Sequence, residues 1–221
     1  MVRYRELLTA LLAIVAITAA YAAFVRAVAV PEASGLVGHG LGVIGFVMML
    51  MTEVLYSLRK RAMRRPRGSM RSWLRFHIIT GIVGPYLVLL HTAWTFNGLA
   101  GWLTVMTMVV VASGFIGRYI YTAVPRTADG VIIEAQVLQA QLDAARLAAV
   151  AAAAATPGRS DRPDRSAARR LGELERQMSA LRWARRVLAT WHAVHIPLGM
   201  ALFVTAFVHI AAAINYATLL R

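Results

Sequence analysis

The chain contains no cysteine, which excludes disulfide bonds, thiolate-bound iron–sulfur clusters and c-type haem attachment within it. Acidic residues are scarce, with 10 Asp and Glu against 24 Lys and Arg, and only 15% of the 221 residues are charged. Because 59% of the residues are hydrophobic, the chain is too apolar for an ordinary soluble domain. The basic residues lie mainly beside apolar segments, so we attribute the net charge of +14 to membrane topology and expect no nucleic-acid partner.

Five long apolar stretches predict an all-α integral membrane bundle with five transmembrane helices. The predicted spans are residues 7–28, 36–58, 73–96, 99–124 and 187–214. Each holds about twenty or more mostly apolar residues, enough to cross a hydrocarbon core of ~30 Å. The first span begins like a secretory signal peptide, but its apolar run is longer than that of a signal, so we expect a retained helix.

Basic residues predict the orientation of these spans in the bilayer. The connection after the second span holds eight Lys and Arg between Arg59 and Arg75, and the segment 125–186 is also rich in arginine. The positive-inside rule places both segments and the N-terminus in the cytoplasm, and the C-terminus outside. We therefore expect a multi-pass protein of a bacterial-type inner (plasma) membrane, in which the third and fifth spans run in the same direction.

The segment 125–186 predicts a cytoplasmic helical hairpin inserted between residues 1–124 and the fifth-span region 187–221. Residues 131–155 are rich in the helix formers Ala and Leu, Thr156-Pro157-Gly158 interrupts them, and residues 166–186 continue helically. Apolar stripes at helical spacing run along both halves: Ile133, Val137, Leu138, Leu142 and Ala145 on the first, and Leu171, Leu174, Met178 and Leu181 on the second. We favour stripes that bury each other, and docking of a soluble electron-transfer partner is compatible with this arrangement.

Two histidine pairs share one spacing. His77 and His91 are fourteen residues apart in the third span, and His195 and His209 are fourteen apart in the fifth. Fourteen residues are almost four helical turns, so each pair lies near one helix face, about 21 Å apart along the axis. Two parallel helices would then offer two stacked histidine–histidine gaps, each able to hold a haem iron from both sides. An antiparallel arrangement would instead pair His77 with His209.

Small and basic residues near the histidines fit a bound haem. Gly81 and Gly199 each follow a histidine by four residues, so they share its helix face and would leave room for a flat ring. The alternative is that small residues simply let membrane helices pack closely. Arg118, late in the fourth span, is a candidate partner for the propionates of the inner haem, and a simple interface anchor is equally consistent with its position.

Three polar residues stand outside this pattern. His39 and His192 lie at the ends of spans, where they are expected to be interfacial, with contact to a propionate, a quinone or a partner as the alternative. Glu53 is the only acidic residue within a predicted span, and its position favours pairing with an arginine over a role as a proton carrier.

The chain resembles the ferric reductase-like transmembrane family across its third to fifth spans. The resemblance lies in the motif from Phe76-His77 through Gly81 to His91, in Ser113-Gly114-Phe115-Ile116-Gly117-Arg118, and in Trp191-His192-Ala193-Val194-His195 continuing to His209. It implies that the four paired histidines are axial haem ligands. Quinol-oxidising cytochrome b subunits use the same fourteen-residue interval. Unlike many ferric reductases, this sequence has no Gly-rich dinucleotide-binding fingerprint, and its fourth and fifth spans are about sixty residues apart.

These features together predict a dihaem b-type cytochrome subunit that carries electrons across the bilayer. It would hold two low-spin, bis-histidine haem b groups, and no residue is expected to be catalytic in itself. The expected partners are the lipid bilayer, a flavoprotein or iron–sulfur subunit, and a quinone as a further candidate. The competing hypothesis is a haem-free membrane scaffold or assembly protein whose arginine-rich hairpin docks a partner.

Overall fold

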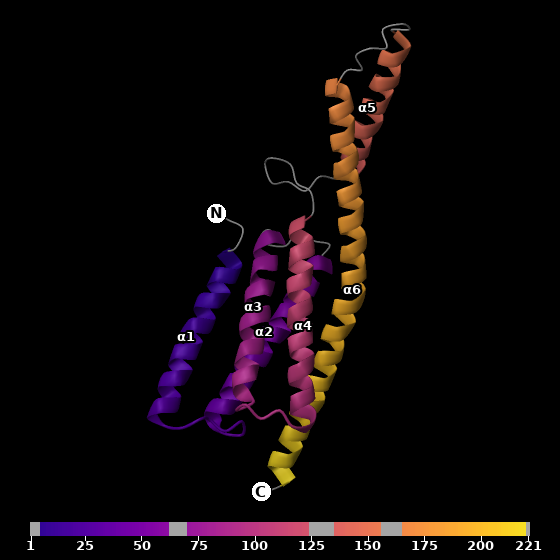
Figure 1. The fold of residues 1–221 in the computed structure, drawn as a ribbon. Helices are drawn as coiled ribbons and strands as arrows, with labels where there is room; N and C mark the ends of the chain where they lie inside the picture. The colour runs from indigo at the N-terminus through magenta and orange to yellow at the C-terminus, as the bar shows by residue number, and fades with distance from the viewer. Residues whose placement is uncertain (1–4, 62–69, 124–134, 156–164, 220–221) are drawn as a thin grey trace. The chain divides into compact units, whose positions relative to one another are not determined.

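A computed structural model describes residues 5–61, 70–123, 135–155 and 165–219, and these residues form six α-helices and no strand (Figure 1). The helices are α1 (Arg5–Ala27), α2 (Leu36–Arg61), α3 (Met70–His91), α4 (Gly98–Ala123), α5 (Ala135–Ala155) and α6 (Arg165–Leu219). Within the described segments, five helices are long and apolar enough to cross a membrane: α1, α2, α3, α4 and α6. The predicted all-α membrane fold is confirmed.

The third span ends earlier than the sequence predicts. We expected it to reach residue 96, but α3 ends at His91 because Ala93 and Trp94 adopt φ angles of 48° and 63°, in the left-handed region. Thr92 stabilises this turn: its Oγ1 accepts a bond from the Trp94 amide at 3.2 Å and its carbonyl accepts one from the Thr95 amide at 2.9 Å. The apolar composition of residues 92–96 does not reveal this turn. As a result, His91 lies in the last turn of α3 and not in the middle of a longer span.

The chain divides into two compact units, Met1–Ser113 with His195–Arg221, and Gly114–Val194. The unit boundaries fall inside α4 and α6. The sequence predicts the second hairpin helix and the fifth span as successive segments, and the structure shows one uninterrupted helix of 55 residues.

In the first unit, α2 and α3 pack closely through glycines. A Cβ atom added to Gly45 would lie 2.7 Å from the carbonyl oxygen of Gly84, and one added to Gly84 would lie 2.9 Å from that of Gly45. Membrane helices approach closely where small residues face each other. On its other side α3 contacts α1, where Val83 and Leu87 surround the buried Ala10, and Thr18 and Tyr86 share a hydrogen bond of 2.6 Å.

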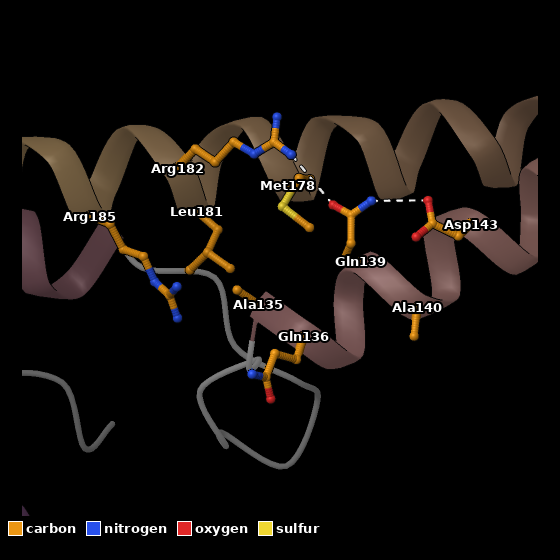
Figure 2. A pocket seen from close by; sticks show the side chains of 9 residues that line it. All are labelled: Ala135, Gln136, Gln139, Ala140, Asp143, Met178, Leu181, Arg182 and Arg185. Carbon is orange, nitrogen blue, oxygen red and sulfur yellow. Dashed lines mark hydrogen bonds between the residues drawn. The ribbon is translucent and has the colours of Figure 1, made fainter.

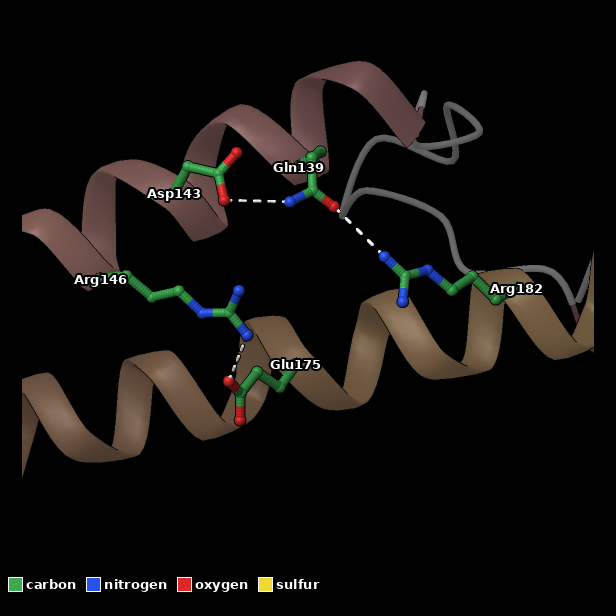
Figure 3. A network of polar contacts seen from close by, with 5 residues as sticks. All are labelled: Gln139, Asp143, Arg146, Glu175 and Arg182. Atoms are coloured by element: carbon green, nitrogen blue, oxygen red, sulfur yellow. Dashed lines mark hydrogen bonds and ion pairs between the residues drawn. The ribbon is translucent and has the colours of Figure 1, made fainter.

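In the second unit, α5 and the N-terminal half of α6 form the predicted hairpin, and its apolar stripes bury each other. Its core consists of Leu138, Leu142, Leu174, Met178 and Leu181, with Ala135, Ala145 and Leu171 packed against it. Two exposed polar contacts cross between the helices: Arg146 pairs with Glu175 at 2.9 Å, and Arg182 donates to Gln139 at 3.4 Å (Figure 3).

The prediction that Val137 belongs to the buried apolar stripe of α5 is wrong. Val137 is 51% exposed, because its neighbour Leu138, about 100° away around the helix, is the residue that faces α6. Ile133, another predicted member, lies outside the described residues.

Candidate functional site

Both histidines of α3 donate a hydrogen bond to the backbone of α2. The Nδ1 atom of His77 lies 3.2 Å from the carbonyl oxygen of Thr52, and that of His91 lies 2.8 Å from the carbonyl oxygen of Gly38. Because a carbonyl oxygen only accepts hydrogen bonds, Nδ1 must carry the proton in each ring. The lone pair of each neutral imidazole therefore lies on Nε2.

The first histidine of the fifth span has the same tautomer through a side chain. The Nδ1 atom of His195 lies 2.5 Å from Oγ of Ser113 on α4. The Ser113 hydroxyl also lies 2.9 Å from the Val110 carbonyl, and when it donates to that carbonyl its oxygen accepts the Nδ1 proton of His195. The lone pair of His195 is thus also on Nε2.

This arrangement matches what metal-binding histidines require. A metal-ligating histidine almost always donates its second ring N–H to a carbonyl, carboxylate or similar acceptor, which fixes the ring orientation and makes the ligating nitrogen more basic. His77, His91 and His195 all have such an acceptor. Their chemistry therefore fits axial ligation of a haem iron through Nε2.

The ring of His91 is also held by van der Waals contact. A Cβ atom on Gly42 would lie only 2.9 to 3.0 Å from Cγ, Cδ2 and Nδ1 of His91, so the imidazole packs directly against the α2 backbone at this glycine. The neighbouring His39, which is exposed, meets His91 edge to face with ring centroids 6.0 Å apart. His39 therefore lies beside the second histidine of the third span, and its role at a membrane interface stays a prediction.

The second histidines of the two pairs lie close together. His91 and His209 are near enough to interact electrostatically, and both are partly buried. Packing of α6 on α2 accompanies this proximity, because Phe46 meets Phe203 and Phe207 edge to face at 6.1 and 5.4 Å. The structure thus brings together two of the four predicted ligands from different spans.

The predicted inner pair has an acidic neighbour from α2. Glu53 interacts electrostatically with His77, and its Oε2 atom lies 4.0 Å from the position that a Cβ would occupy on Gly199. A Cβ on Gly81 would lie 3.5 Å from Cγ2 of Thr52. Both predicted clearance glycines therefore face the Thr52–Glu53 turn of α2, and their role toward a haem stays a prediction.

Two other predicted residues belong to the second unit. Arg118 lies late in α4, one residue after Gly117, where a methyl group would overlap the indole of Trp191. Trp191 in turn contacts the ring of His192, with centroids 4.8 Å apart. The proposed contact of Arg118 with a haem propionate stays a prediction.

Among the residues that the structure describes, no three or more His, Asp or Glu side chains form a metal-ion cluster. A haem held by histidines would need only two protein ligands.

Sequence reasoning missed the acceptors that orient the histidines. The carbonyls of Gly38 and Thr52 carry no sequence signal, because every residue has one. A signal for the packing was available: Gly38, Gly42 and Gly45 recur at intervals of four and three residues, which places them on one face of α2.

Comparison with known proteins adds no relative. The chain matches no family model, no curated protein and no solved structure. The functional assignment therefore depends on the geometry of the histidines and on the resemblance of their motifs.

Proposed function

We propose that the protein is a dihaem b-type cytochrome subunit that carries electrons across a membrane. His77 and His195 would hold one haem, and His91 and His209 the other, each as a bis-histidine, low-spin centre. The observation that carries this proposal is the shared tautomer: three histidines on two spans direct Nδ1 to a protein acceptor and keep the lone pair on Nε2. Histidines that only hydrogen-bond across a bundle have no need of one common tautomer.

The protein's own contribution is binding and orientation. The α2 carbonyls and Ser113 orient three imidazoles, and all three histidines lie on apolar helices. Haem, when bound, supplies the one-electron redox chemistry. The histidines would hold the haem from both sides, and the group would then supply electron transfer.

The resemblance to ferric reductase-like membrane domains supports a place within a larger oxidoreductase. We propose a bacterial-type plasma membrane location with the N-terminus cytoplasmic and the C-terminus outside, following the distribution of basic residues. Electrons would enter from a separate flavoprotein or iron–sulfur subunit, or from a quinone. The exposed His39 beside His91 is a candidate quinone contact on the exterior side.

Haem content of the purified protein tests this function. We expect two b-type haems per polypeptide and a low-spin reduced-minus-oxidised spectrum. One haem would mean that one histidine pair has been assigned wrongly. A colourless, folded preparation from haem-replete cells would contradict the cytochrome proposal and favour a scaffold in which the hairpin is the working part.

Replacing Ser113 by alanine should weaken one haem site selectively. The change removes the acceptor of His195 Nδ1, so the ring loses its orientation and Nε2 becomes less basic. We expect about 10- to 100-fold weaker haem retention at one site, measured as the rate of haem transfer to an excess of apomyoglobin. The other haem should transfer at the wild-type rate.

Thr107→Ala is the matched control for Ser113→Ala. Thr107 lies on the same helix and is buried, and its hydroxyl donates to Leu103 of its own helix at 2.8 Å. Both haems should transfer from this variant at wild-type rates. Equal haem loss from the two variants would show that α4 is merely destabilised, and would count against the role assigned to Ser113.

A further inference from the structure

The hairpin carries an open groove between the start of α5 and the N-terminal half of α6 (Figure 2). Its volume is about 550 Å³, within the range of ~300–1,000 Å³ typical of small-molecule sites. The groove is lined by Ala135, Gln136, Gln139, Ala140, Asp143, Met178, Leu181, Arg182 and Arg185. Apolar residues form its floor, and side chains able to donate hydrogen bonds stand at its edges.

The groove has a positive end and a negative end. Arg182 and Arg185 are both exposed and stand opposite the first turns of α5, near Gln136 and Gln139. Asp143 lies one turn further along α5, where Gln139 donates to it at 3.0 Å. Arg185 and Gln136 therefore offer hydrogen-bond donors at the end from which α6 continues, and the guanidinium of Arg182 lies further along the groove, where it donates to Gln139 at 3.4 Å (Figure 2). Planar guanidinium groups suit the oxygens of a phosphate.

The sequence of α6 indicates how deep in the bilayer the positive end of the groove lies. No Asp, Glu, Lys or Arg occurs between Val187 and Leu220, and α6 enters this apolar run without a break. Arg185 and Arg182 precede Val187 by two and five residues, or about 3 and 7.5 Å of helix. The headgroup layer of one leaflet is about 5–7 Å thick, so taking Val187 as the start of the hydrocarbon core places both arginines at headgroup depth.

An exposed tryptophan supports the same depth. Trp183 is 54% exposed between the two arginines, although a large apolar side chain gains nothing from contact with bulk water. Tryptophan is enriched at membrane–water interfaces, where its ring lies among the headgroups. Ala184 beside it is fully buried, so this turn of α6 has one packed face and one face that fits the interface.

We propose that this groove binds the phosphate headgroup of an anionic phospholipid from the adjacent leaflet. Arg182 and Arg185 bind the phosphate oxygens, Gln136 donates to the headgroup, and Trp183 lies among the neighbouring headgroups. The depth of the arginines favours a lipid over a soluble acidic partner, which would approach the hairpin from the aqueous side. The proposal is independent of the haem assignment.

Native mass spectrometry of the full-length protein tests the proposal. The protein is released from nanodiscs that contain phosphatidylcholine and phosphatidylglycerol with matched chains, and the retained lipids are identified. Wild type should retain phosphatidylglycerol preferentially. In Arg182→Gln/Arg185→Gln the preference should fall roughly fivefold for each arginine removed, or about 25-fold in total. Arg182→Lys/Arg185→Lys keeps the charge and should retain most of the preference.

Arg169→Gln/Arg170→Gln is the matched control, with the same change in net charge. These exposed residues precede Val187 by at least seventeen residues, or about 25 Å of helix, beyond the Debye length of ~8–10 Å. The control should keep the wild-type preference, and far-ultraviolet circular dichroism should show equal helicity in all variants.

Three results would overturn the proposal. One is an unchanged phosphatidylglycerol preference in Arg182→Gln/Arg185→Gln, or an equal loss in the control. Another is displacement of the retained lipid by an excess of inorganic phosphate, which would indicate a site for free anions. The third is binding of a poly-glutamate peptide in pure phosphatidylcholine nanodiscs that depends on the two arginines, which would assign the groove to an acidic protein partner.

Discussion

Replacing His209 by alanine should lower the haem content from the proposed two per polypeptide to one. His91→Ala should remove the same haem, because the two histidines lie close together on different spans. His77→Ala and His195→Ala should remove the other haem, leaving a spectrum distinct from that of the first two variants. The measurement is the pyridine haemochrome content together with the reduced-minus-oxidised spectrum of each variant.

Double variants decide which histidines share an iron. His91→Ala/His209→Ala should retain one haem, as each single variant does, because a site that is already lost cannot be lost twice. His77→Ala/His209→Ala should retain none. The reverse pattern would establish the antiparallel pairing of His77 with His209. His39→Ala serves as the control and should retain both haems, since this exposed ring only borders His91.

Replacing Gly45 by leucine should have the largest effect on stability. A Cβ at this position would lie 2.7 Å from the Gly84 carbonyl and within 3.0 Å of Leu87 and Val88, so α2 and α3 would have to separate. Overpacking costs about 1–3 kcal/mol when neighbours can adjust, and here a backbone oxygen stands in the way, so we expect more than ~3 kcal/mol. The measurement is thermal unfolding in detergent, followed by circular dichroism and by haem release.

Gly40→Ala is the matched control on the same helix. No atom lies within 4 Å of the position that its Cβ would occupy, so the methyl group meets no neighbour. Alanine also favours the helix over glycine by up to about 1 kcal/mol. We expect an unchanged or slightly raised unfolding temperature. Similar unfolding temperatures for Gly45→Leu and wild type would show that the α2–α3 contact is not tight.

The membrane-spanning helices could be predicted from the sequence because their apolar length marks them directly. The continuity of the second hairpin helix with the fifth span could not, because the arginine-rich turns before Val187 differ in composition from the apolar run that follows within the same helix. The end of α3 could not, because Trp94 and Phe96 are as apolar as the span, and the left-handed turn at Ala93 and Trp94 depends on hydrogen bonds to Thr92. The hairpin core was predictable from spacing, except at Val137, where the stripe does not show which of two adjacent residues faces the partner helix.

The candidate site was predictable only in its histidines. Their repeated interval is visible in the chain, whereas the acceptors for Nδ1 come from other helices. Ser113 on α4 reaches His195 across 82 positions of sequence. Such pairing depends on how the helices rotate and cross, which one sequence does not specify. The glycines at 38, 42 and 45 come nearest to a signal, because they mark the face of α2 that the histidine ring contacts.

The contact between His91 and Gly42 has a kinetic consequence for the proposed electron transfer. The imidazole of His91 is held by the hydrogen bond from Nδ1 to the Gly38 carbonyl and by packing against the backbone at Gly42. It therefore has almost no rotational freedom. A ligand that cannot turn or shift when the charge on its metal changes keeps the reorganisation energy small, because preorganised groups need not move during the reaction. Any side chain at Gly42 would push the ring of His91 away. We expect such a substitution to slow electron tunnelling through the proposed haem of His91 and His209, even where that haem is retained.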